Sequence, residues 1–146
     1  MNQSDAHTKI RVVPGATLRA MAGIGQAVEA RMEAALGALA VTWPQYEILQ
    51  ALCLDACPML SELADRVRCV RSNITALVDR LERDGLVRRI PNPEDRRSLK
   101  VELTQAGFKA YTEAAHALEQ VEDEILGGLS AEEQKILRIV FERLMT

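Results

Sequence analysis

Basic side chains concentrate in one stretch of this 146-residue chain, although the whole chain carries a net charge of −3. Between residues 66 and 100 they outnumber acidic side chains by ten to five, so this segment carries +5 and the remainder −8. The ten are Arg66, Arg68, Arg71, Arg80, Arg83, Arg88, Arg89, Arg96, Arg97 and Lys100. Attraction to phosphates depends on the local field rather than on the total charge. By charge alone, nucleic-acid binding and an ordinary solvated surface are about equally favoured.

Polar side chains that can bind DNA bases lie at the start of a predicted helix. A helix is predicted over residues 71–84, because apolar residues recur there at helical spacing on one face: Ile74, Leu77, Val78 and Leu81. The first turns of this helix offer four polar groups: Arg71, Ser72, Asn73 and Thr75. Arginine can bind guanine through two hydrogen bonds, asparagine can bind adenine, and hydroxyl groups can bind bases or phosphates. These four residues are therefore candidate DNA contacts.

A second basic group lies in a predicted β-hairpin. Residues 86–90 and 99–103 alternate as strands do, and two prolines between them favour a loop. Arg96 and Arg97 at its tip could enter a minor groove, where narrow A·T-rich segments concentrate negative potential. Lys100, on the second strand, is a further candidate DNA contact. Asp95 would repel phosphate, so we interpret it as a brace that orients Arg97 through a charge-assisted pair.

The elements that must position these groups are mostly helical. Helices are predicted over residues 18–39, 43–55, 62–67, 71–84, 106–126 and 131–145. Thr42 and Gln45 form a predicted capping box at the start of the second helix, Ser61 is predicted to cap the third, and Gly85 suits the end of the fourth. A short helix, a tight turn, a second helix and a hairpin make a winged helix-turn-helix. The expected fold class is mainly α with a small β-wing.

Four segments of the chain resemble the MarR family of bacterial transcriptional regulators. They are residues 42–49, 63–64, 72–87 and 95–104. The last fits the family's wing pattern, Asp-x-Arg-Ser-x-x-Val-x-Leu-Thr, at every specified position. Through helix order and length, the resemblance extends more loosely over nearly the whole chain. It implies a single MarR-type domain over residues 1–146.

The resemblance also implies a homodimer with two wings, bound to a short inverted repeat of double-stranded DNA. Residues 42–104 would form the DNA-binding lobe, while the helices within 16–40 and 105–146 would form the dimer. Ser72 and Asn73 would read the major groove, and Arg97 would be the wing arginine. The turn before the recognition helix departs from the family, because Arg68-Cys69-Val70 replaces the usual glycine and hydroxyl cap. Either Ser72 caps the helix later or the turn has another shape.

Three cysteines leave two interpretations open. Cys53 and Cys57 are four residues apart on a predicted helix, and Cys69 lies in the turn before the recognition helix. They could form a thiol-based oxidant sensor, as in some members of the family, or they could be small packing residues. A metal site is not expected, since zinc needs three or four ligands and no histidine or second cysteine motif lies nearby.

A cavity for a small aromatic or phenolic ligand is implied by the resemblance, between the dimerisation helices and the DNA-binding lobe. Candidate lining residues are Met21, Met32, Trp43, Tyr46 and Tyr111. Core packing is the alternative for each of them, because large apolar residues at helical spacing usually pack in a core.

Other functional classes are disfavoured by the sequence. No Gly-x-Ser-x-Gly, His-Glu-x-x-His or phosphate-binding glycine loop occurs, so we expect neither an enzyme nor a cofactor. No apolar run approaches ~20 residues and the N-terminus is polar, so we expect a cytoplasmic protein with free thiols and no membrane partner. The sequence predicts a homodimeric repressor released by a small ligand. A winged module that binds a partner protein is the alternative from another class.

Overall fold

The computed structural model describes residues 13–55, 57–67 and 71–145, without the side chains of Arg71 and Ser72. Within these ranges the chain is mainly helical with one small antiparallel sheet, which confirms the predicted fold class. The elements in chain order are α1 (Ala16–Gly37), α2 (Trp43–Leu54), α3 (Leu60–Arg66), α4 (Arg71–Arg83), β1 (Val87–Pro91), β2 (Leu99–Leu103), α5 (Gln105–Leu126) and α6 (Ala131–Leu144). None of the helices described is long and apolar enough to cross a membrane.

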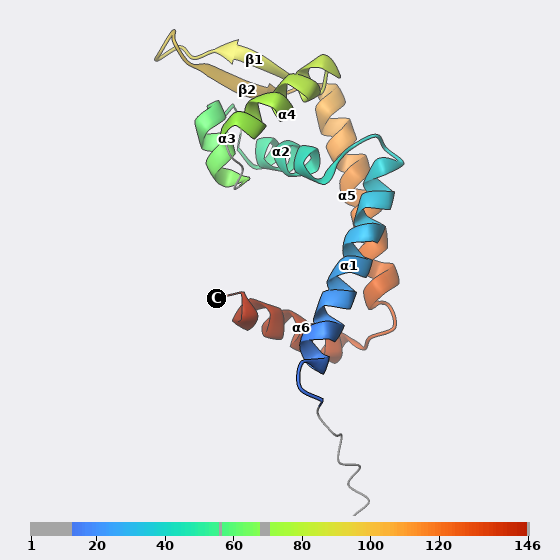
Figure 1. Cartoon of the computed structure of the whole chain (residues 1–146). Coiled ribbons are helices and arrows are strands. Elements are labelled where there is room, and N and C mark those ends of the chain that lie inside the picture. Colours follow the sequence, from blue (N-terminus) through green and yellow to red (C-terminus); the bar gives the residue numbers. More distant parts are fainter. Residues whose placement is uncertain (1–12, 56, 68–70, 146) are drawn as a thin grey trace, which may run out of the picture.

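Two long antiparallel helices carry a small lobe at one end (Figure 1). The lobe consists of α2, α3, α4 and the β1–β2 hairpin, and α1 and α5 run away from it side by side. At the far end of this pair, α6 turns away from α1 and α5. The winged lobe is therefore separated from α6 by the length of a helix pair.

Helix starts follow their local capping chemistry. At α2, the Thr42 N–H donates to Gln45 Oε1 at 2.9 Å and the Gln45 N–H donates to Thr42 Oγ1 at 3.4 Å, which confirms the predicted capping box. Ser130 and Glu133 form the same motif at α6. The predicted cap at Ser61 is wrong. The Glu62 carboxylate instead accepts the Met59 N–H at 2.8 Å, so α3 begins at Leu60.

The hairpin pairs in the predicted direction, with Val87 opposite Leu103 and Pro91 opposite Leu99. Its second strand, β2, also contacts the chain just before α3. The Val101 N–H donates to the Pro58 carbonyl at 2.9 Å, and Met59 bridges to Lys100. The wing is thus joined to the helix-turn-helix by backbone hydrogen bonds.

Two apolar clusters hold the elements together. The larger one fills the winged lobe and includes the predicted inner face of α4, with Ile74, Val78 and Leu81 at most 1% exposed. The smaller one lies where α1, α2 and α5 meet and comprises Leu36, Val41, Tyr46 and Ala114. The lobe is therefore anchored to the long helices by its own packing.

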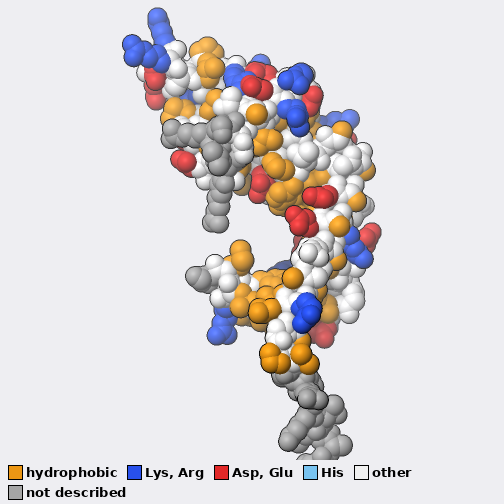
Figure 2. Space-filling view, in the orientation of Figure 1, with side chains coloured by type: hydrophobic (Ala, Val, Ile, Leu, Met, Phe, Trp, Pro, Cys, Tyr) orange, Lys and Arg blue, Asp and Glu red, His pale blue; other side chains and the backbone are white. Residues whose placement is uncertain are grey.

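At the far end of the molecule, the described residues leave an apolar surface exposed. No residue of α6 is buried. Exposed large apolar side chains on this helix and on the first half of α1 are Leu18, Met21, Ile24, Ile136, Ile139, Val140, Phe141 and Leu144. Figure 2 shows hydrophobic side chains gathered over α6 and the neighbouring end of α1. Contiguous apolar patches of this kind mark interaction surfaces.

Candidate nucleic-acid interface

The outward face of α4 presents part of the predicted base-reading set. Asn73 and Thr75 are exposed on the first turns, while Ile74 and Val78 are buried on the opposite face. Arg71 and Ser72 begin the helix, but their side chains lie outside the described residues. A polar, solvent-facing helix start over an apolar inner face is what insertion into a major groove requires.

The wing tip holds both predicted arginines in the open. Arg96 and Arg97 are exposed, and Lys100 is half-buried on β2. Lys and Arg side chains project at the end of the wing in Figure 2. Asp95 braces this loop, but through the backbone rather than through the predicted charged pair. Its Oδ1 accepts the Arg97 N–H at 2.9 Å, as expected for an Asx turn.

Asn92 is a structural residue of the wing that the sequence analysis missed. It is 5% exposed, and its amide donates to Ser98 Oγ at 2.9 Å across the base of the loop. Its Oδ1 accepts the Glu94 N–H at 3.1 Å, and its own N–H donates to the Ser98 carbonyl at 3.2 Å. In the sequence, the Asn92-Pro93 step indicated a turn at this position. These bonds hold the arginine-bearing loop in one shape before any ligand arrives.

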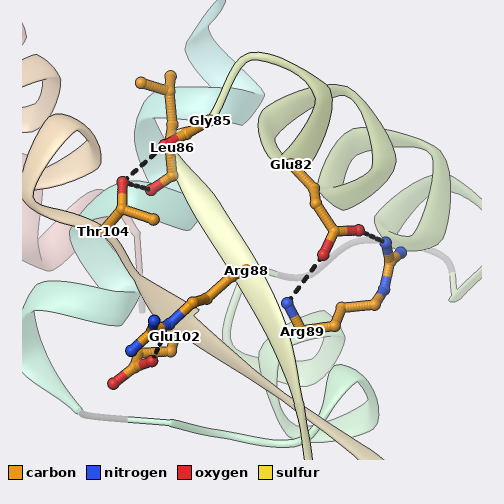
Figure 3. Close-up of polar contacts among 7 residues, drawn as sticks. All are labelled: Glu82, Gly85, Leu86, Arg88, Arg89, Glu102 and Thr104. Atoms are coloured by element: carbon orange, nitrogen blue, oxygen red, sulfur yellow. Dashed lines mark hydrogen bonds and ion pairs between the residues drawn. The ribbon is translucent and has the colours of Figure 1, made fainter.

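Arg89 is a second residue that the sequence analysis did not single out. From β1 its guanidinium pairs with both Asp79 and Glu82 of α4. Its backbone N–H donates to Glu82 Oε1 at 2.9 Å, and Figure 3 shows both contacts between Arg89 and Glu82. The backbone hydrogen bond from Arg89 is the largest influence that lowers the pKa of Glu82. Burial acts to lower the pKa of Arg89, but its bonds to Asp79 and Glu82 raise it overall. The recognition helix and the wing are thus joined by charged hydrogen bonds.

Thr104 connects this lobe to α5. Its Oγ1 donates to the carbonyls of Gly85 and Leu86 at 2.7 and 3.0 Å (Figure 3). It also accepts the Gly107 N–H at 3.0 Å. Gly85 has φ +74°, a left-handed conformation that suits glycine at a helix end. The last residue of the wing pattern therefore caps α5 and fixes the end of α4.

Comparison with known proteins identifies this architecture. The model of the MarR family matches residues 41–99. The transcriptional regulator PrsX of Escherichia coli is 31% identical over 112 residues, which cover 75% of this chain and 68% of that protein. HosA of Escherichia coli O111:H- is 30% identical over 105 residues, which cover 72% of this chain and 78% of that protein. The chain belongs to the MarR family.

Solved structures place the MarR-family similarity over almost the whole chain. A mutant MarR of Escherichia coli in complex with operator DNA is 26% identical, with a TM-score of 0.76 over 98% of this chain and 100% of that one. YusO of Bacillus subtilis is 25% identical, with a TM-score of 0.76 over 88% and 92% of the two chains. This protein is accordingly a winged-helix, DNA-binding transcriptional regulator of the MarR family.

The aromatic residues predicted to line a ligand cavity form a stack at the junction of the lobe and the long helices. Ring centroids are 5.5 Å apart for Trp43–Tyr46 and 5.8 Å apart for Tyr46–Tyr111. Burial is the main reason that the pKa of Tyr46 is raised. Met32 is half-buried, and Met21 lies exposed about 16 Å further along α1, given a 1.5 Å rise per residue. The stack thus unites the three aromatic residues but not Met21.

Cys53 and Cys57 were predicted to share one helix face, and this prediction is wrong. Because α2 ends at Leu54 and Asp55 is extended, Cys57 lies beyond the helix, with φ +60°. Both Cys53 and Cys57 are half-buried free thiols, and burial raises the pKa of Cys53, which disfavours the reactive thiolate. Cys69 lies outside the described residues. In the part of the chain that the structure describes, no group of three or more His, Cys, Asp or Glu side chains could hold a metal ion.

Proposed function

We propose that the protein represses transcription as a homodimer on an inverted-repeat operator, and that a small aromatic ligand releases it. Each lobe, residues 42–104, would place the start of α4 in a major groove and Arg96 and Arg97 in the adjacent minor groove. The helices within 16–40 and 105–146 would form the dimer. Such a regulator would act in the bacterial cytoplasm, where the chromosome lies.

The observation that carries this proposal is the joint geometry of α4 and the wing. An exposed polar helix start and an exposed arginine tip belong to one lobe, and α4 is bonded to β1 through the Glu82 carboxylate and Arg89. MarR of Escherichia coli, which is similar over 98% of this chain, has been solved in complex with operator DNA. Two such lobes related by a two-fold axis would contact half-sites about one helical turn, or 10 bp, apart.

Homodimer formation is supported by the uncovered apolar surface of α1 and α6. Leu18 is 71% exposed and Leu144 is 61% exposed, so these side chains would gain from burial against a second copy. The arrangement would leave both lobes at the outside of the dimer. Ligand release is supported by the Trp43–Tyr46–Tyr111 stack, because a ligand inserted there would change how the lobe sits on the long helices. The raised pKa of Cys53 makes oxidant sensing at that thiol the weaker alternative.

An unbiased selection of duplexes by the purified protein tests the proposed function. We expect enrichment of an inverted repeat, and we expect log affinity to fall with log salt by roughly 0.9 for each phosphate neutralised. Fluorescence anisotropy at several salt concentrations measures that slope. A flat salt response with no enriched duplex would instead favour a winged module that binds a protein partner.

Arg97→Ala should weaken binding to the selected operator by about 1–3 kcal/mol, because the variant loses the wing-tip contact. The dimer should persist, since the wing tip is remote from α6. Arg31→Ala, which removes an equal charge from the exposed surface of α1, is the matched control and should bind almost as the wild type does. Anisotropy titration and analytical ultracentrifugation measure the two properties. Equal loss in both variants would show that only net charge matters.

A further inference from the structure

The structure points to Arg89 as a positioning residue for DNA binding, although the sequence does not place it at the DNA surface. We infer that Arg89, held by Asp79 and Glu82, fixes the wing relative to the recognition helix so that both bind DNA as one rigid unit. This inference rests on the proposed two-groove contact. The Asp79–Glu82–Arg89 cluster would thus contribute to operator affinity without contacting DNA.

Asp79 and Glu82 are three residues apart on α4, so they are neighbours on one helix face. Both carboxylates reach the same guanidinium, whose side chain is only 16% exposed. An arginine can bind two acceptors at once because its N–H groups form a planar fork, whereas a lysine ammonium acts as a point charge. The cluster therefore fixes the orientation of β1 relative to α4 as well as the distance between them.

The backbone of β1 takes part in the same contact. Arg89 lies opposite Val101 in the hairpin, yet its N–H donates to Glu82 Oε1 rather than remaining open at the strand edge. Glu82 thus binds both the backbone and the side chain of Arg89 (Figure 3). A rotation of the wing away from α4 would break three charged hydrogen bonds together, since Asp79 would also lose its partner.

Rigid coupling matters because the two DNA contacts come from different elements. Only residues 84–86 separate α4 from β1. Once α4 is bound in the major groove, the wing tip binds in an intramolecular step. The DNA affinity gained from that step depends on how closely the position of the wing relative to α4 is fixed. A loosely held wing would keep its arginines and its charge but would lose part of this gain.

The neighbouring Arg88 provides a matched control. It belongs to the same strand and carries the same charge, but it pairs with Glu102 across the hairpin, entirely within the wing. Its side chain is 65% exposed. Arg88→Gln and Arg89→Gln therefore remove equal charge from the same lobe, and only the second loosens the wing from α4.

The test measures operator affinity and the coupling between helix and wing. Asn73→Ala and Arg97→Ala, alone and combined, are made in the wild type, in Arg89→Gln and in Arg88→Gln, and their affinities for the selected operator are compared. We expect Arg89→Gln to weaken operator binding about tenfold more than Arg88→Gln does. In the wild type and in Arg88→Gln, the effects of Asn73→Ala and Arg97→Ala on operator affinity should be non-additive, and in Arg89→Gln they should become additive. Arg89→Lys, which retains the charge but not the fork, should not restore the coupling.

Equal affinities for Arg88→Gln and Arg89→Gln, or unchanged coupling in Arg89→Gln, would overturn the inference. Glu82→Gln provides a milder variant, since its amide oxygen can still accept the Arg89 N–H while the charged pair is lost; it should show the same reduction in coupling. Thermal unfolding of each DNA-free variant separates positioning from loss of folding. If the wild type selects no duplex, the proposed function fails instead.

Discussion

Gly107→Ala is expected to lower the free energy of unfolding by about 3 kcal/mol, at the upper end of the range for overpacked sites. A Cβ at this position would lie 1.9 Å from the carbonyl oxygen of Leu86. That oxygen cannot easily move, because it also accepts the N–H and the Oγ1–H of Thr104. Either α5 must shift away from the end of α4 or these hydrogen bonds must break. Urea unfolding at fixed protein concentration measures the loss.

Gly37→Ala is the matched control for this substitution. Gly37 is the last residue of α1, and a Cβ there would meet no atom within 4 Å. Because alanine restricts the unfolded chain more than glycine does, this variant should gain about 0.4–1 kcal/mol. If Gly107→Ala were as stable as the wild type, α5 and the Leu86 carbonyl between α4 and β1 would not approach each other as the structure describes.

Features set by neighbouring residues could be predicted from the sequence. The capping boxes at Thr42 and Ser130 join residues three apart, and the apolar face of α4 repeats at the helix period, so both follow from local patterns. The second wing strand was predicted over residues 99–103 and is observed there. The first was predicted at 86–90 but covers 87–91, because the Leu86 N–H donates to the Leu81 carbonyl at the end of α4.

Features that depend on tertiary neighbours could not be predicted. Arg88 and Arg89 are adjacent and identical in type, yet only Arg89 faces α4, and that depends on which side of β1 the helix packs. Ser61 looked like a cap, but the bridge between Met59 and Lys100 sets where the chain enters α3. Similarly, Asp95 bonds the backbone of Arg97 because the tight loop brings that N–H to its carboxylate.

The structure shows whether the described candidate DNA contacts are exposed, but not what each of them binds. The structure places Asn73, Thr75, Arg96 and Arg97 in exposed positions on one lobe. Which base or phosphate each side chain binds stays a prediction. The reason is physical, since base reading depends on the docking angle of α4, which the proposed dimer and the DNA would set together with this chain.

Val140→Glu is expected to prevent dimer formation and to weaken operator binding about 100-fold or more, because a single lobe loses the avidity of two linked sites. Val140 lies on α6 between Ile136 and Leu144, four residues from each, and all three are exposed in the chain. A carboxylate at the centre of this row would be desolvated in an apolar interface. Glutamate is a good helix former, so α6 itself should persist. Analytical ultracentrifugation measures assembly, and anisotropy measures affinity for the full operator.

Leu54→Glu controls for the charge change, because Leu54 is 82% exposed at the end of α2, far from α6. This variant should remain dimeric and bind the operator nearly as the wild type does. A duplex with a single half-site adds a sharper comparison: Val140→Glu should bind it about as well as one wild-type lobe does, since α4 and the wing are unchanged. If Val140→Glu were monomeric but still bound the full operator like the wild type, two-fold recognition would be wrong, and one lobe would account for all of the specificity.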